Sequence, residues 1–187
     1  DILLGKVNPS GKLNVSFPRS TGNTPCFYNH FVTDREESFD QPGTPEEPKG
    51  HYIFDKPEPL WNFGHGKSYT TFDYVDCALS DTLLVASDTL KVSVTIKNTG
   101  RRDGKEVVQL YVRDKVSTVA TPIQQLKAFQ KVLIKPGESQ CVELSLPIAE
   151  LALYNAKMEE VVEPGDFEIQ IGAASDDIRF KKTITIN

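Results

Sequence analysis

Adjacent carboxylates are the residues of this chain that come closest to a hydrolytic pattern. Hydrolysis by a carboxylate pair needs two carboxyl groups on opposite sides of the scissile bond, about 5 to 9.5 Å apart. The acidic pairs here are neighbours in sequence: Glu36-Glu37, Glu46-Glu47, Glu159-Glu160 and Asp176-Asp177. Nothing in the sequence positions two adjacent carboxylates on opposite sides of a scissile bond. We expect Asp176-Asp177 in a hairpin loop. We interpret all four pairs as solvated charge and predict no catalytic residue.

The histidines and cysteines do not have the spacing of a metal site. The histidines are at positions 30, 51 and 65, and the cysteines at 26, 77 and 141. The sequence contains no nucleophile elbow, phosphate loop or dinucleotide fingerprint. We therefore predict neither a metal nor a cofactor. Cys77 lies on the inward face of its strand and Cys141 on the outward face of another, which disfavours a disulfide between them.

Aromatic side chains are densest between residues 61 and 74, at Trp61, Phe63, Tyr69, Phe72 and Tyr74. Two interpretations stay open. Aromatic faces can stack on sugar rings, or they can pack a linker against a domain. The surrounding glycines and prolines favour packing, so we predict a domain-docking site formed by Trp61, Phe63, Tyr69 and Phe72.

Composition limits the class of protein that carries these residues. The chain has 187 residues, of which 39% are hydrophobic and 25% charged, as in an ordinary globular protein. The net charge of −5 argues against a nucleic-acid partner. No apolar run reaches the roughly 20 residues of a membrane span. The chain begins with Asp1 and has no signal region, so we expect a piece of a longer protein.

Residues 34–60 read as an acidic, proline-rich linker. The stretch contains eight acidic and three basic residues and five of the twelve prolines. Such a segment buries too little apolar surface to offset its ordering entropy. We expect an extended surface linker here.

Alternating strands dominate residues 61–187. Apolar residues recur with period two in four segments, and in each the intervening polar residues, such as Gln109, Tyr111 and Gln170, are predicted to face water. A fifth segment, Ile178 to Ile186, is discordant at Lys182, and shorter strands are expected at Val75-Cys77-Leu79 and at 129–134. Pro136-Gly137 and Pro164-Gly165 predict turns. The pattern predicts an immunoglobulin or fibronectin type III-like β-sandwich. The four segments are Leu90-Val92-Val94-Ile96, Val108-Leu110-Val112, Val142-Leu144-Leu146 and Phe167-Ile169-Ile171.

The first 33 residues have too few elements to form a core. Asp1 to Gly5 resembles the last turn of a helix that ends at a glycine, and Leu13 to Phe17 alternates like a strand. We expect residues 1–33 to be the end of an α/β domain that packs on a partner.

Several motifs, in order, resemble the C-terminal portion of glycoside hydrolase family 3, the β-glucosidase and β-xylosidase family. The first group resembles the end of that family's α/β sandwich domain: Pro9-Ser10-Gly11-Lys12-Leu13, Phe17-Pro18-Arg19-Ser20 and Phe27-Tyr28-Asn29-His30. The second resembles its fibronectin type III-like domain: Trp61-Asn62-Phe63-Gly64-His65-Gly66, Glu106-Val107-Val108-Gln109-Leu110-Tyr111 and Glu163-Pro164-Gly165-Asp166-Phe167. The resemblance weakens between residues 31 and 59.

The resemblance implies a non-catalytic region of a retaining glycosidase. In that family the nucleophilic Asp and the acid/base Glu lie upstream of the matched portion, so neither is carried over to this chain. The implied partners are the upstream catalytic domains and, for the whole enzyme, an oligo- or polysaccharide substrate, with a periplasmic or secreted location. A carbohydrate-binding module and a spacer or adhesion domain are the alternatives.

Overall fold

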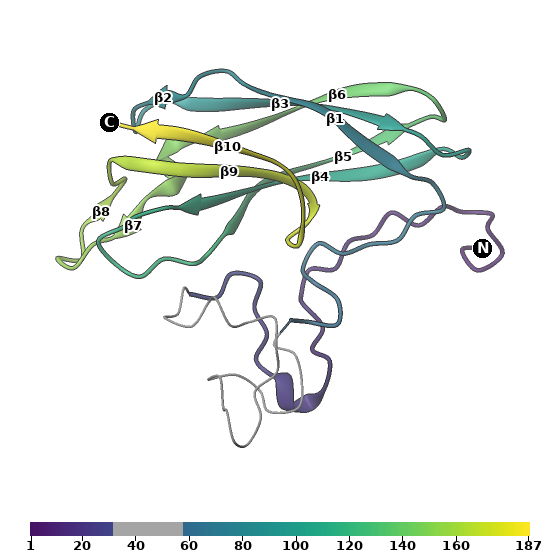
Figure 1. Ribbon diagram of the computed structural model, residues 1–187, viewed down its shortest axis with the longest axis horizontal. Coiled ribbons are helices and arrows are strands. Elements are labelled where there is room, and N and C mark those ends of the chain that lie inside the picture. Colours follow the sequence, from purple (N-terminus) through teal and green to yellow (C-terminus); the bar gives the residue numbers. More distant parts are fainter. Residues whose placement is uncertain (32–57) are drawn as a thin grey trace.

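Two facing β-sheets make up most of the chain. The computed structural model describes residues 1–31 and 58–187 (Figure 1). The smaller sheet is antiparallel, in the order β1-β3-β6, with β1 at Phe72–Leu79, β3 at Thr89–Asn98 and β6 at Ser139–Pro147. The expected acidic linker falls almost wholly outside the described residues.

The larger sheet has five strands in the order β2-β10-β9-β4-β5. Only the short pairing of β2 with β10 is parallel. A small antiparallel pair, β7 (Leu153–Tyr154) and β8 (Glu160–Val161), follows the 3-10 helix η3 (Ile148–Leu151), and a second such helix, η1, spans Thr21–Asn23. The bounds of the five strands are Leu83–Leu84 (β2), Gly104–Asp114 (β4), Gln125–Ile134 (β5), Gly165–Ala174 (β9) and Asp177–Ile186 (β10).

The predicted β-sandwich is confirmed, and the period-two residues form its core. In β3 the four alternating apolar residues from Leu90 to Ile96 are fully buried, and Val142, Leu144 and Leu146 of β6 lie beside them. Each such side chain contributes on the order of 1.5–3 kcal/mol when it leaves water. Cys77 is buried and Cys141 is exposed, and all three cysteines are free, as the sequence predicts.

Val75 contradicts the predicted alternation of the first strand. We expected it to share the inward face with Cys77, but the structure leaves its side chain 57% exposed. The pairing of β1 with β3 shifts between Tyr74 and Asp76, so Val75 is the extra residue of a β-bulge. One extra residue reverses the faces, and Tyr74 takes the inward position instead.

The outer face of the larger sheet also differs from the prediction. Tyr111 is fully buried, Gln109 is 2% exposed and Gln170 is buried too, although alternation predicts all three in water. For Gln109 and Tyr111 the reason is a partial further layer: residues 1–31 and 58–66, here called the N-terminal segment, contact the sheet there through Gly64 O and the Tyr28 ring. Gln170 donates to Glu168 Oε1 within its own strand. Sequence alternation cannot reveal a cover that comes from elsewhere in the chain.

The N-terminal segment forms turns and single bridges where a strand was expected. Phe17 makes one isolated bridge, to Trp61, and residues 13–16 belong to no strand. Leu13 N–H donates to His65 O at 2.8 Å, and Leu13 O accepts from Gly64 N–H at 2.8 Å. Residues 1–6 form turns and no helix, and Gly5 has the positive φ of 69° expected of a terminating glycine.

Candidate domain-docking site

A partly buried ion pair joins the N-terminal segment to the sandwich. Lys12 Nζ lies 3.1 Å from Glu106 Oε1 of β4 and donates to Ala173 O of β9 at 3.0 Å. The Glu106 side chain is only 7% exposed. Tyr74 OH of β1 donates to the same carboxylate oxygen at 3.3 Å. Burial raises the pKa of Glu106, and the Lys12 ammonium partly offsets that rise.

A neutral polar cluster lies on the outer face of the larger sheet. Tyr111 OH donates to Gln109 Oε1 at 2.6 Å, and Gln109 Nε2 donates to Ala173 O at 2.5 Å and to Gly64 O at 3.4 Å. Gly64 has a φ of 80°, and a Cβ there would clash with the Gln109 side chain and the Ala174 backbone. Only glycine allows so close an approach with this backbone conformation.

An aromatic stack covers this cluster. The Tyr28 ring stacks on Phe63 with centroids 4.1 Å apart and meets Tyr111 edge-on at 5.9 Å. Phe63 O accepts from Ser175 N–H at 3.0 Å, and Tyr28 OH accepts from Leu126 N–H of β5 at 3.2 Å. Burial raises the pKa of Tyr111, so its hydroxyl stays protonated and can donate at neutral pH.

Both ends of the segment are also attached to the sandwich. At one end, Asn8 Nδ2 donates to Asp103 O at 2.9 Å, and Arg102 Nη1 donates to Gly5 O at 2.7 Å. At the other end, Ile123 N–H donates to His30 O at 2.9 Å. The contacts therefore extend from the β3–β4 connection to the β4–β5 connection.

The four residues predicted to form a docking site have different neighbours. Phe63 lies in the aromatic stack, and Phe72 packs against the core of the sandwich. Trp61 and Tyr69 are about half exposed: Trp61 meets Phe17 edge-on at 5.8 Å, and Tyr69 OH donates to Ile2 O at 2.9 Å. The sequence prediction omitted Lys12, Glu106, Gln109 and Tyr28. A Glu within the apolar run of β4 was the available signal for a buried partner.

Many apolar side chains of the N-terminal segment are exposed. Leu3 is 96% and Leu4 75% exposed, and other apolar side chains along the segment are about half exposed. Exposed apolar patches of this kind mark interaction sites. The half-exposed set is Ile2, Val7, Val15, Phe17, Phe27, Phe31, Leu60 and Trp61.

The other candidate residues form no metal-binding group in the part of the chain that the structure describes. No group of His, Cys, Asp and Glu residues there could hold a metal ion, and no helix there has the length and apolarity of a membrane span. Asp176 lies in the β9–β10 turn, where it accepts from Asn62 Nδ2 at 2.8 Å, and Asp177 pairs with Arg179. The pairs at 36–37 and 46–47 and His51 lie outside the described residues.

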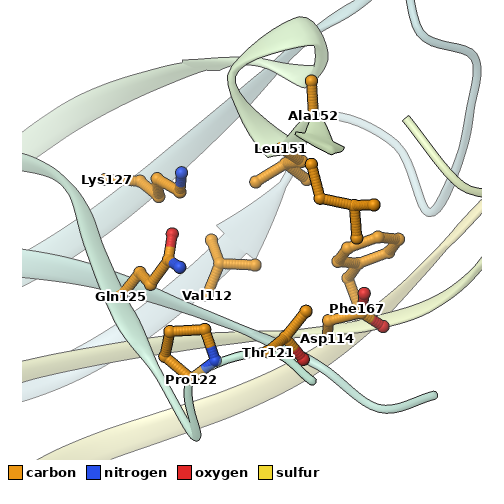
Figure 2. A pocket seen from close by; sticks show the side chains of 10 residues that line it. Val112, Asp114, Thr121, Pro122, Gln125, Lys127, Leu151, Ala152 and Phe167 are labelled. Atoms are coloured by element: carbon orange, nitrogen blue, oxygen red, sulfur yellow. The ribbon is translucent and has the colours of Figure 1, made fainter. Parts of the chain in front are cut away.

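One pocket lies where β4, β5 and η3 meet (Figure 2). Its volume is about 50 Å³, and its lining combines Asp114, Gln125 and Lys127 with the apolar side chains of Leu151 and Phe167. Lys127 Nζ donates to Glu150 O at 2.7 Å, and Asp114 accepts from Val116 N–H at 3.2 Å. The space suits a few water molecules and is too small for a sugar ring.

Comparison with known proteins agrees with this architecture. One family model, the fibronectin type III-like domain, matches residues 106–175, and the glycosyl hydrolase family 3 C-terminal domain matches residues 1–69. A periplasmic beta-glucosidase of Salmonella typhimurium is 40% identical over 94% of this chain, and a beta-xylosidase of Formosa agariphila is 41% identical over 96%. The chain covers 22% and 24% of these two relatives.

A solved structure extends the likeness to three dimensions. The crystal structure of a beta-glucosidase from Listeria innocua in complex with glucose matches with a TM-score of 0.87 and 36% identity, over all of this chain and 25% of that one. The fold is thus a fibronectin type III-like sandwich whose larger sheet is covered around Gln109 and Tyr111 by an N-terminal segment. The chain belongs to glycoside hydrolase family 3 and corresponds to the C-terminal part of its members.

Proposed function

We propose that this chain is a non-catalytic C-terminal region that supports the catalytic domains of a retaining β-glucosidase-like enzyme. Its relatives are named as beta-glucosidases and beta-xylosidases about four times its length, so the catalytic carboxylates are expected upstream. One observation carries the docking role: apolar side chains of residues 1–17 stay exposed on a segment that is fixed to the sandwich. The upstream domains are the partner that would cover them.

We further propose a division into three parts. Residues 1–33 belong with the upstream α/β domain, residues 34–60 link the two, and residues 61–187 form the fibronectin type III-like domain. In this division Trp61, Phe63, Tyr69 and Phe72 line the junction between the domains. The contacts of Phe63 with Tyr28 and of Tyr69 with Ile2 support that placement.

Activity on an aryl β-glucoside tests the proposal. We expect the 187-residue chain to show no turnover, because double displacement needs two carboxylates that it lacks. A longer protein that includes the upstream region should hydrolyse the substrate. In that protein Leu3→Asp should lower stability and activity, since it places a charge in an apolar contact. Val116→Asp, at another strongly exposed site, is the control. Turnover by the short chain would contradict the proposal.

A carbohydrate-binding module is the second candidate function. The edge-on pair of Phe17 and Trp61 is half exposed and could stack on a sugar ring. Retention on insoluble β-glucan or xylan, lost in Trp61→Ala, would favour this candidate. No retention of the unchanged chain would exclude it.

A further inference from the structure

Two short motifs that stand 94 residues apart meet at the Lys12–Glu106 ion pair, in which the carboxylate is buried. Gly11-Lys12-Leu13 supplies the ammonium, and Glu106 supplies the carboxylate at the start of an otherwise apolar strand. Neither residue is used by the proposed catalysis. Pairs of this kind give little stability, because the desolvation of both charges opposes their attraction. The position of this pair therefore calls for another explanation.

Most other contacts between the segment and the sheet involve uncharged groups. The segment contributes backbone carbonyls, as at Phe63 and Gly64, and ring stacking, as at Tyr28. A neighbouring backbone carbonyl can accept the same kind of hydrogen bond after a displacement, and stacked rings can slide. A buried charge has no such equivalent. If Lys12 moved, the Glu106 carboxylate would stay buried without a cation, at a high cost in free energy.

We propose that the Lys12–Glu106 pair selects a single register of the N-terminal segment on the larger sheet, at the start of β4 and the end of β9. Through that register it sets the orientation in which the segment meets the upstream domains, and only this last step rests on the proposed function. The Lys12 ammonium bridges the two strands, because it binds Glu106 of β4 and Ala173 O of β9. Tyr74 limits the position of the carboxylate from the opposite sheet.

Few other charges compete for this site. Burial raises the pKa of the Tyr74 hydroxyl, and of the charges near it, Asp177 raises this pKa further and Arg179 lowers it. These two residues pair with each other, with Arg179 Nε 2.6 Å from Asp177 Oδ1. Arg179 lies over the Tyr74 ring at 5.8 Å. Among the described residues, Lys12 is the cation that pairs with Glu106.

The test compares Lys12→Met, Glu106→Gln and the double variant in the 187-residue chain by two-dimensional NMR and amide exchange. The reporters are Leu13 N–H and Gly64 N–H, which bond within the segment, and Val92 N–H in the core strand β3 is the reference. Lys91→Met with Glu143→Gln removes an exposed pair, 3.5 Å long, and is the matched control. We expect Lys12→Met to speed exchange at Leu13 and Gly64 at least about tenfold relative to Val92.

The double variant decides the question, because it leaves no buried charge unpaired and stays informative even where Lys12→Met fails to fold. We expect its segment signals to split, broaden or shift to a new single position, while the control variant keeps the signals of the unchanged chain. One set of segment signals at unchanged positions, with unchanged exchange, would overturn the proposal. The measurements need no upstream domain, so this outcome leaves the proposed function standing. Conversely, an inactive longer protein would not affect the register result.

Discussion

Several individual residues in this chain have a burial that their residue type does not predict. Tyr111, Gln109 and Glu106 are polar, yet the N-terminal segment removes them from water. Each has a hydrogen-bond partner in the structure, which is the condition for burying a polar group at low cost. Val75 is the converse case, an apolar residue that a bulge places in solvent.

Leu110 and Val75 provide a matched test of side-chain orientation. Leu110→Ala should lower the free energy of unfolding by about 2–5 kcal/mol, because it leaves a cavity in the core. Val75→Ala should change it by less than about 0.5 kcal/mol, as at other exposed positions. Urea unfolding followed by circular dichroism measures both. A large loss for Val75→Ala would show that the bulge is absent in solution.

Glu106 predicts a pH dependence of stability. Its pKa is raised above the usual 4.5 in the folded chain, so the folded state holds this proton more tightly than the unfolded state. The resulting contribution to stability is present in acid and is lost as the pH rises from about 4.5 through the higher folded-state pKa. Glu106→Gln should remove this loss. Unfolding free energies measured across that range should fall less steeply in the variant, and equal slopes would contradict the assignment.

At the scale of elements, sequence periodicity predicts the position of a strand and its core-facing side, because both depend on residues close together along the chain. The strands around Leu90, Leu144 and Ile169 lie where alternation places them, because one face of each contacts the core. The covered outer face and the bulge at Val75 depend on contacts with distant segments, which alternation does not contain. The candidate site was predicted only in part for the same reason: Phe63 is in a dense aromatic stretch, whereas Lys12 has no local signal.

Gly64 and Gly137 test how tightly the N-terminal segment lies on the sheet. Both have positive φ, at 80° and 76°, so alanine is strained by roughly 1–2 kcal/mol at either position. Only at Gly64 would the added Cβ also meet the Gln109 side chain and the Ala174 backbone. Gly64→Ala should therefore lower the melting temperature more than Gly137→Ala. Equal shifts would mean that the close approach is not maintained in solution.

At the scale of the whole molecule, the sandwich and the N-terminal segment share an interface of polar and aromatic groups. The sandwich has its own continuous core between the two sheets, to which the segment contributes no buried residue in the described chain. The segment depends on the sandwich for its ion pair, its aromatic stack and its end contacts. This asymmetry predicts different behaviour of the two parts when they are separated.

Removal of the segment tests that dependence. A chain of residues 68–187 should keep the two sheets, because about 120 residues with one core is an ordinary domain size. It should bind an apolar dye more strongly and unfold at lower denaturant concentration, since Tyr111 loses the ring of Tyr28 that packs against it. Circular dichroism, dye fluorescence and urea titration measure these changes. Loss of all β structure would show that the segment is required for folding itself.

The long sequence separation of the segment's contacts also has a kinetic consequence. Lys12 joins Glu106 and Ala173 across 94 and 161 residues, so these contacts close very large loops. The entropy lost in closing these loops opposes the contacts until β4 and β9 are paired. We therefore expect them to form after the rate-limiting transition state. A substitution that weakens them should leave the refolding rate nearly unchanged and accelerate unfolding. The N-terminal segment would then determine how long the folded chain persists, with little influence on how fast it forms.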